Sequence, residues 1–185
     1  MFDLIKLLQA VGYAGFFSII FAESGILIGF FFPGDSLLFT AGFLTSQGVF
    51  DIYNLLVLGV LGAVLGDSFG YWFGKKAGPK IFIREDSWFF HKQHLDRARK
   101  FYEQHGGKAV VLAIFLPIIT TFAPILAGVG KMHYPIFLLY NIGGGAFWVL
   151  TITLLGYFFG HIVPQADRYV IPIVLLIIVI SVLPT

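Results

Sequence analysis

Two carboxylates, Glu23 and Asp35, lie in sequence that is otherwise suited to lipid. A charge at the centre of a bilayer costs at least ~2.5–3.5 kcal/mol on insertion scales. The cost falls when the carboxyl is protonated, so such a group can load and release a proton as its access to water alternates. Glu23 is therefore a candidate proton-coupling residue. The alternative is a carboxylic acid that hydrogen-bonds a neighbouring helix for packing.

Asp35 follows a dipeptide that breaks a helix. Pro33 removes a backbone donor and Gly34 admits positive φ. Asp35 could also cap the helix expected from Ser36, by accepting hydrogen bonds from its free N–H groups. A proton-coupling role and a capping role are both open for Asp35. Pro33, Gly34 and Ser36 are candidates for lining a substrate cavity at this break.

The composition places these residues in a membrane protein. Of the 185 residues, 58% are apolar and only 12% are charged. A soluble domain of this size exposes too much of its chain to hide that surface, whereas a helix of ~20 apolar residues spans a bilayer. We expect an all-α integral membrane protein with a single membrane domain over 1–185. The chain has no cysteine, which excludes disulfide and thiol chemistry.

The first half of the chain is expected to hold one broken segment and one span. Residues 13–44 form two half-length apolar segments around the break, a pattern typical of a re-entrant hairpin or a discontinuous helix. Residues 52–74 form a span whose glycines, three or four residues apart, give one face on which another helix can pack. Residues 2–11 either lie at the interface as a short amphipathic helix or start the first membrane helix.

Residues 75–108 carry nine of the twelve Lys and Arg residues, so the positive-inside rule places this loop in the cytoplasm. An amphipathic helix is expected over 86–105, and a basic helix beside a membrane lies on anionic lipid headgroups. We favour that partner over nucleic acid. Asp67, near the cytoplasmic end of its span, is expected to be a structural acid that faces this loop. The histidines of the loop make no persuasive metal site, and we expect neither a metal nor a cofactor.

The second half repeats the order of a broken segment and a span. Residues 109–129 are apolar but interrupted, which predicts a second re-entrant segment; the interrupting residues are Pro117, Thr120, Thr121 and Pro124. Residues 134–160 form a long span with an interior Asn141, which is expected to bridge helices and is also a candidate for the substrate cavity. Residues 168–184 form the last span.

An internal repeat links the two halves. Ala41-Gly42 lies 28 residues before the Gly-Tyr-Trp-Phe-Gly that begins at Gly70, and Ala127-Gly128 lies 28 residues before the Gly-Tyr-Phe-Phe-Gly that begins at Gly156. If each hairpin returns to its own side, each repeat, 1–84 and 85–165, crosses the membrane once. Successive repeats must then be inverted, and inverted repeats with broken helices near the midplane are a transporter architecture.

A set of short motifs runs through nearly the whole chain. The first half carries Glu23-Ser-Gly, Pro33-Gly34-Asp35-Ser36 and Gly66-Asp67-(x)3-Tyr71, and the second carries Phe115-Leu116-Pro117, Ala127-Gly128-(x)3-Met132, Asn141 and Trp148. In combination they resemble the DedA family, also called the VTT or SNARE-associated family. The resemblance implies two facing re-entrant segments plus membrane helices, and it implies that Glu23 and Asp35 are the essential acids.

The same resemblance implies lipid transport. Bacterial members are implied to translocate lipids, notably undecaprenyl phosphate, and to depend on the proton motive force; eukaryotic relatives are implied to scramble phospholipids. We therefore expect a transporter rather than an enzyme, in the bacterial inner membrane, with a lipid phosphate headgroup and protons as its partners. A homo-oligomer is left open. The alternatives are an energy-independent phospholipid scramblase and a membrane scaffold without transport.

The chain departs from the family pattern at two positions. Where the family has Arg three residues before and three residues after the second proline, this chain has Ile114 and Thr120. Arg pairs bidentately with phosphate oxygens, so without it only half-helix N-termini and backbone N–H groups remain for the anion. We expect impaired function, whether the change is engineered or natural. The cavity candidates on this side are Ile114, Pro117, Thr120 and Thr121.

Overall fold

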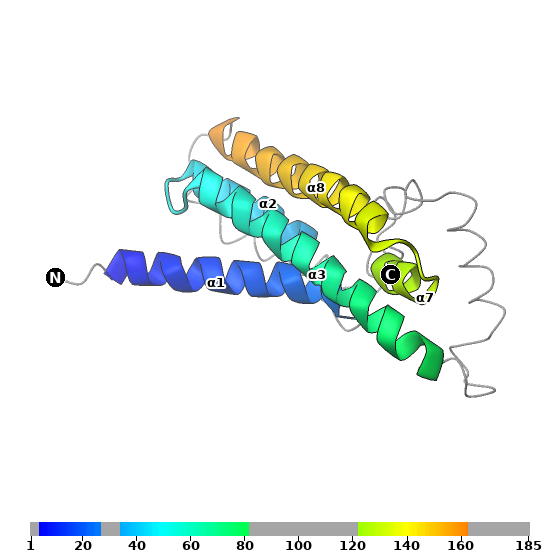
Figure 1. The fold of residues 1–185 in the computed structure, drawn as a ribbon. Helices are drawn as coiled ribbons and strands as arrows, with labels where there is room; N and C mark the ends of the chain where they lie inside the picture. The colour runs from blue at the N-terminus through cyan, green and yellow to red at the C-terminus, as the bar shows by residue number, and fades with distance from the viewer. Residues whose placement is uncertain (1–3, 27–33, 82–121, 163–185) are drawn as a thin grey trace.

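The computed structural model of the chain describes residues 4–26, 34–81 and 122–162, with side chains from 12–26, 34–77 and 122–162. These ranges form helices α1 (Leu4–Gly25), α2 (Gly34–Ser46), α3 (Ile52–Ile81), α7 (Phe122–Val129) and α8 (Tyr134–Ile162) (Figure 1). Within them there is no β-strand, which confirms the all-helical prediction for this part of the chain. The segments predicted at 86–105 and 168–184 lie outside the described residues.

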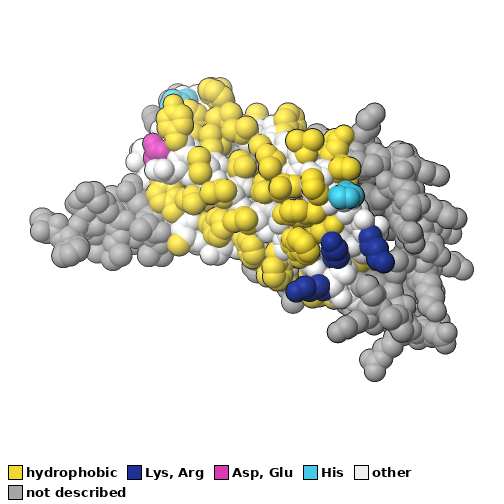
Figure 2. Space-filling model, in the orientation of Figure 1, with side chains coloured by type: hydrophobic (Ala, Val, Ile, Leu, Met, Phe, Trp, Pro, Cys, Tyr) yellow, Lys and Arg dark blue, Asp and Glu magenta, His cyan; other side chains and the backbone are white. Residues whose placement is uncertain are grey.

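Helices α3 and α8 are the two described helices long and apolar enough to cross a membrane, over Ile52–Ala77 and Tyr134–Ile162. At ~1.5 Å per residue, either exceeds the ~30 Å hydrocarbon core of a bilayer. Their outward faces are apolar, and the exposed side chains include Val57, Leu61, Leu65, Leu139, Leu150 and Leu155. In Figure 2 hydrophobic side chains cover the middle of the visible face, and the coloured Lys, Asp and His side chains lie toward its ends.

Helices α1 and α2 form a hairpin in which the end of α1 lies against the start of α2, and Gly25 of α1 lies against Gly66 in the middle of α3. The second helix begins at Gly34, directly after the proline that was predicted to break the segment. Residues 4–11 continue without interruption into α1, which agrees with the interpretation that they start the first membrane helix. A short turn then connects α2 to α3, and within it Gly48 has a φ of 77°, a conformation that glycine adopts without strain.

The helices approach closely because glycines replace side chains at the crossings. A Cβ added to Gly66 would lie 2.5 Å from the backbone oxygen of Phe21 in α1. A Cβ at Gly42 of α2 would overlap the backbone oxygen of Thr153 in α8, and one at Gly128 of α7 would overlap that of Tyr71 in α3. The glycine-lined face predicted for residues 52–74 is thus a helix-packing face.

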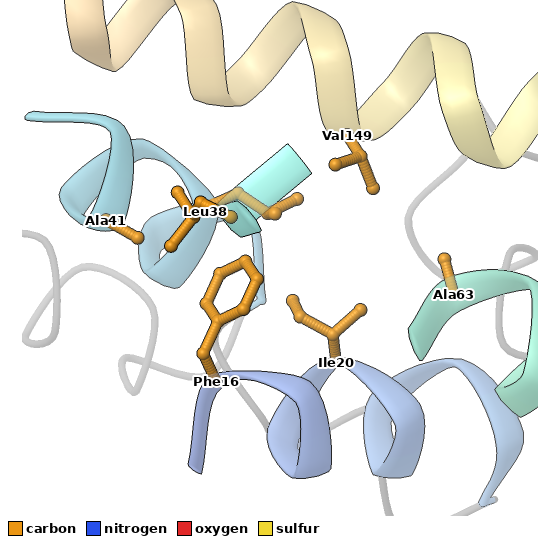
Figure 3. Close-up of a cluster of buried hydrophobic side chains, with 7 residues drawn as sticks. Phe16, Ile20, Leu38, Ala41, Ala63 and Val149 are labelled. Atoms are coloured by element: carbon orange, nitrogen blue, oxygen red, sulfur yellow. The ribbon is translucent and has the colours of Figure 1, made fainter. Parts of the chain in front are cut away.

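Two apolar cores lie between these helices. The larger joins α1, α2, α3 and α8 through fully or almost fully buried side chains, six of which are labelled in Figure 3: Phe16, Ile20, Leu38, Ala41, Ala63 and Val149. The smaller surrounds Tyr71 of α3, whose ring stacks on Phe137 of α8 at 4.8 Å between centroids. The Tyr71 hydroxyl donates to the backbone oxygen of Met132 and so holds the start of α8 against α3.

Replacing Gly42 with Ala should lower the free energy of unfolding by about 1–3 kcal/mol, because the added methyl collides with the backbone of α8. The matched control is Gly143→Ala on α8, where a Cβ meets no atom within 4 Å. That control should stabilise its helix by up to ~1 kcal/mol. Thermal unfolding in detergent measures both, and equal melting temperatures for the two variants would contradict the packing account.

Candidate functional site

The tip of the α1–α2 hairpin brings Glu23 against the first residue of α2. Glu23 lies two residues before the end of α1, and its carboxyl occupies the space where a Cβ of Gly34 would be. Oxygen Oε2 of Glu23 is buried and has no hydrogen-bond partner among the described residues. Glycine at position 34 is therefore what admits this carboxyl to the start of α2.

Asp35 lies beside Glu23, in the first turn of α2. Its side chain is exposed, and its Oδ1 accepts a hydrogen bond of 2.6 Å from the indole Nε1–H of Trp148. A carboxylate in a first turn also interacts favourably with the free N–H groups of its helix. The capping role and the proton-coupling role thus both stay open for Asp35, but the contact to Trp148 ties it to α8.

The two acids lie at the level of the midpoints of both long helices. A Cβ on Gly25, at the end of α1, would lie 2.6 Å from the backbone oxygen of Gly66, which is the fifteenth of the 30 residues of α3. Trp148 is the fifteenth of the 29 residues of α8. If α3 and α8 span a bilayer, the acids are at its centre, where an ionisable group marks a substrate or ion pathway.

Asp67 and Asn141 add buried polar groups next to this level. Oxygen Oδ1 of Asp67 is buried and unpartnered among the described residues. Asn141 is fully buried and donates from Nδ2 to the backbone oxygen of Val64 at 3.1 Å, so it bridges α8 to α3 as expected. Its Oδ1 is also buried without a partner in the described part of the chain. The loop that Asp67 was expected to face lies largely outside the described residues; Lys75 lies over the Trp72 ring at 4.9 Å.

Several predicted site residues cannot be placed. Pro33, Ile114, Pro117, Thr120 and Thr121 lie outside the described residues, and so does most of the second broken segment. Gly34, Asp35 and Ser36 form the start of α2, next to Glu23. Within the described ranges, no group of three or more His, Cys, Asp or Glu residues could hold a metal ion.

Trp148 is the site residue that the sequence did not single out. It entered the sequence analysis as one member of a motif, without a role. The signal was there, because an indole N–H inside an apolar span requires an acceptor. The available acceptor, Asp35, is 113 residues away in the sequence, and only the packing of α2 on α8 brings the two together.

Comparison with known proteins gives a consistent picture. The model of the VTT domain matches residues 32–158. The chain is 44% identical to Protein DedA of Escherichia coli K12 over 174 residues, which covers 93% of this chain and 79% of the relative. It is 40% identical over 183 residues to an uncharacterized membrane protein of Mycobacterium leprae (94% and 82%), and 31% identical over 150 residues to the Inner membrane protein YqjA of Escherichia coli K12 (80% and 67%). No solved structure matches.

Trp148→Phe should keep the ring but lose the donor to Asp35. In a double-mutant cycle with Asp35→Asn, we expect a coupling of about 1 kcal/mol in the free energy of unfolding, the usual contribution of one hydrogen bond. Denaturation in detergent of the four proteins measures it. Strictly additive effects of the two substitutions would contradict the contact.

Proposed function

Because the chain belongs to the VTT-domain, or DedA, family of membrane proteins, we propose that it is a proton-linked transporter that moves a lipid phosphate headgroup across the bacterial inner membrane. Undecaprenyl phosphate is the substrate that we favour. The observation that carries the proposal is the pair of adjacent acids, Glu23 and Asp35, level with the midpoints of the two candidate spans. An acid pair at that depth has no need to exist for packing alone.

The acid pair is suited to exchanging one proton. Two neighbouring carboxylates repel when both are ionised, so a site of this kind favours a shared proton. A proton on Glu23 would also lower the cost of burying its carboxyl, whose Oε2 has no hydrogen-bond partner among the described residues. The indole N–H of Trp148 donates a hydrogen bond to Asp35 and so holds this carboxyl against α8. We infer that Glu23 carries the proton and that Asp35, held by Trp148, responds to it.

The packing of the half-length helices supports the proposed inverted repeat. Helix α2 of the first repeat packs on α8 of the second, and α7 of the second packs on α3 of the first. The glycines that make these crossings, Gly42 and Gly128, occupy equivalent positions 86 residues apart. On this proposal, the hairpin of α1 and α2 is one re-entrant segment and the chain leading into α7 is the other, and they face each other across α3 and α8.

The described charges agree with the proposed orientation. Lys75 and Lys76 lie near the end of α3, where the basic segment 75–108 begins. By the positive-inside rule this end of the long helices is cytoplasmic. We propose that the basic segment rests on anionic headgroups there.

Energy-independent scrambling of phospholipids is the second candidate. It is favoured by Ile114 and Thr120, which cannot form an ion pair with a phosphate, together with an Asp35 that is exposed at mid-depth. Such a site would select headgroups weakly and pass many of them. A scaffold without transport is the third candidate, in which both carboxyls only hold helices together.

Glu23→Gln should abolish the response of headgroup movement to a pH gradient, because the amide cannot carry the proton. In proteoliposomes with undecaprenyl phosphate, we expect the unmodified chain to move the headgroup about tenfold faster with an imposed gradient, a coupling of 1–2 kcal/mol. The matched control is Asp51→Asn, since Asp51 accepts from the Asn54 amide at the start of α3 and Asn caps equally well. Identical rates with and without the gradient would leave scrambling as the better account.

Introducing arginine at positions 114 and 120 together should increase binding of a lipid phosphate. Each bidentate Arg–phosphate pair strengthens the contact, and we expect about a tenfold lower Kd for the double variant. Binding of a polyprenyl phosphate in detergent measures it, with a neutral polyprenol as the control ligand. An unchanged Kd would place the headgroup elsewhere.

A further inference from the structure

Each long helix carries a pair of glycines one helical turn apart, in the motifs Gly-Tyr-Trp-Phe-Gly and Gly-Tyr-Phe-Phe-Gly. In the two repeats, opposite members of this pair lie against a backbone oxygen. In α3 the second glycine, Gly74, lies against the backbone oxygen of Ile125 in α7. In α8 the first glycine, Gly156, lies against the backbone oxygen of Phe39 in α2.

The other two glycines have no backbone neighbour close enough to require them. A Cβ on Gly70 would lie 3.4 Å from both the Gly25 oxygen and a side-chain carbon of Ile125, which is ordinary contact. A Cβ on Gly160 would lie 2.9 Å from the Cβ of Ser46 and 3.1 Å from the ring of Phe43, so close contact with side chains of α2 accounts for this glycine. Packing in this arrangement therefore explains the glycine at position 160 but not the one at position 70.

The short helices α2 and α7 contact their long helices at positions of the repeat that differ by one helical turn. Gly42 lies against the oxygen of Thr153, whereas its equivalent Gly128 lies against the oxygen of Tyr71. Tyr71 corresponds to Tyr157, four residues beyond Thr153. So α7 lies four residues further along α3 than α2 lies along α8, a displacement of ~6 Å.

Helix α1 also contacts α3 through backbone oxygens that face glycines of α3 every four residues. The backbone oxygens of Phe17 and Phe21 lie 3.2 Å and 2.5 Å from where Cβ atoms of Gly62 and Gly66 would be. The oxygen of Gly25 faces Gly70 in the same way at 3.4 Å. A one-turn shift of α1 toward the start of α3 places the oxygens of Phe21 and Gly25 on Gly62 and Gly66, clears Gly70 and brings the oxygen of Phe17 to Leu58.

We propose that α1, α2 and α7 slide as one unit by one helical turn along α3 and α8. In the shifted state Ile125 rests on Gly70 in place of Gly74, and Phe39 rests on Gly160 in place of Gly156. Helices α3 and α8 run in opposite directions (Figure 1), so both exchanges move the half-helices toward the same end of the long helices. One-turn ratchets between packed helices are an established kind of two-state change.

The slide moves the acid site past the midpoint of the long helices. Asp35 would leave Trp148, so the hydrogen bond between them holds the present state. A role for the slide in transport rests on the proposed function, whereas the slide itself is a change in the positions of helices. It is therefore tested without any lipid substrate.

The absence of native cysteine allows a direct test by cross-linking in membranes. The rings of Phe21 in α1 and Phe69 in α3 lie 5.9 Å apart, so the pair F21C/F69C reports the present state. Leu65 lies one turn earlier on α3 and is exposed, so F21C/L65C reports the shifted state. A short bis-methanethiosulfonate would give the yield of each pair.

Glycine substitutions should move these yields in opposite directions. Gly70→Ala is tolerated in the present state but overlaps Ile125 in the shifted state, so it should lower the F21C/L65C yield about tenfold, the effect of one overpacked methyl. Gly74→Ala should raise that yield relative to F21C/F69C. A yield ratio that is the same in the unmodified, Gly70→Ala and Gly74→Ala backgrounds would overturn the slide, whatever the transported molecule is.

A second set of cysteine cross-links tests whether transport depends on the slide. The rings of Phe39 in α2 and Phe159 in α8 lie 5.8 Å apart across the sliding surface, and those of Trp72 and Tyr134 lie 5.3 Å apart within the α3–α8 pair. Linking F39C to F159C should reduce headgroup movement at least tenfold, reversibly on reduction, while linking W72C to Y134C should leave it within about twofold. Full movement in the linked F39C/F159C protein would overturn the proposal that transport uses the slide.

Discussion

Backbone-to-backbone contact at glycines is the interaction on which the rest of this fold depends. In lipid, apolar side chains gain little from leaving one hydrocarbon surface for another, so helices associate where they can come very close. Here α1 and α7 both rest on glycines of α3, while α2 and α8 meet at Gly42 and Gly156. The apolar cores around Val149 and Tyr71 fill the space beside these crossings.

The same crossings position the acids. The close approach of Gly25 to Gly66 fixes the depth of the hairpin tip, and the bare Cα of Gly34 admits the Glu23 carboxyl. The packing of α2 along α8 then brings Asp35 within reach of the indole of Trp148. The positions of the two acids along the long helices are thus set largely by contacts that involve no charged group.

Local features of the sequence predicted more than its long-range features did. The start of α2 at Gly34 and the positions of α3 and α8 follow from helix breakers and apolar length, which act within a few residues. Helix α3 runs on to Ile81, beyond the predicted span over 52–74, because lysine and alanine are good helix formers and a change in polarity does not end a helix. The partner of each glycine face, the exchange of half-helices between repeats and the contact of Trp148 with Asp35 depend on residues far apart in the chain. No local pattern specifies them.

The contact between Asp35 and Trp148 also has a consequence for synthesis. The donor is made 113 residues after the acid, which at 5–20 residues per second is a delay of roughly 5–20 s. During that time α2 has neither its indole donor nor the α8 surface on which Gly42 packs. The first hairpin must therefore wait at the membrane with an unpaired acid at its tip, and it reaches its final place only when the second half of the chain has been made.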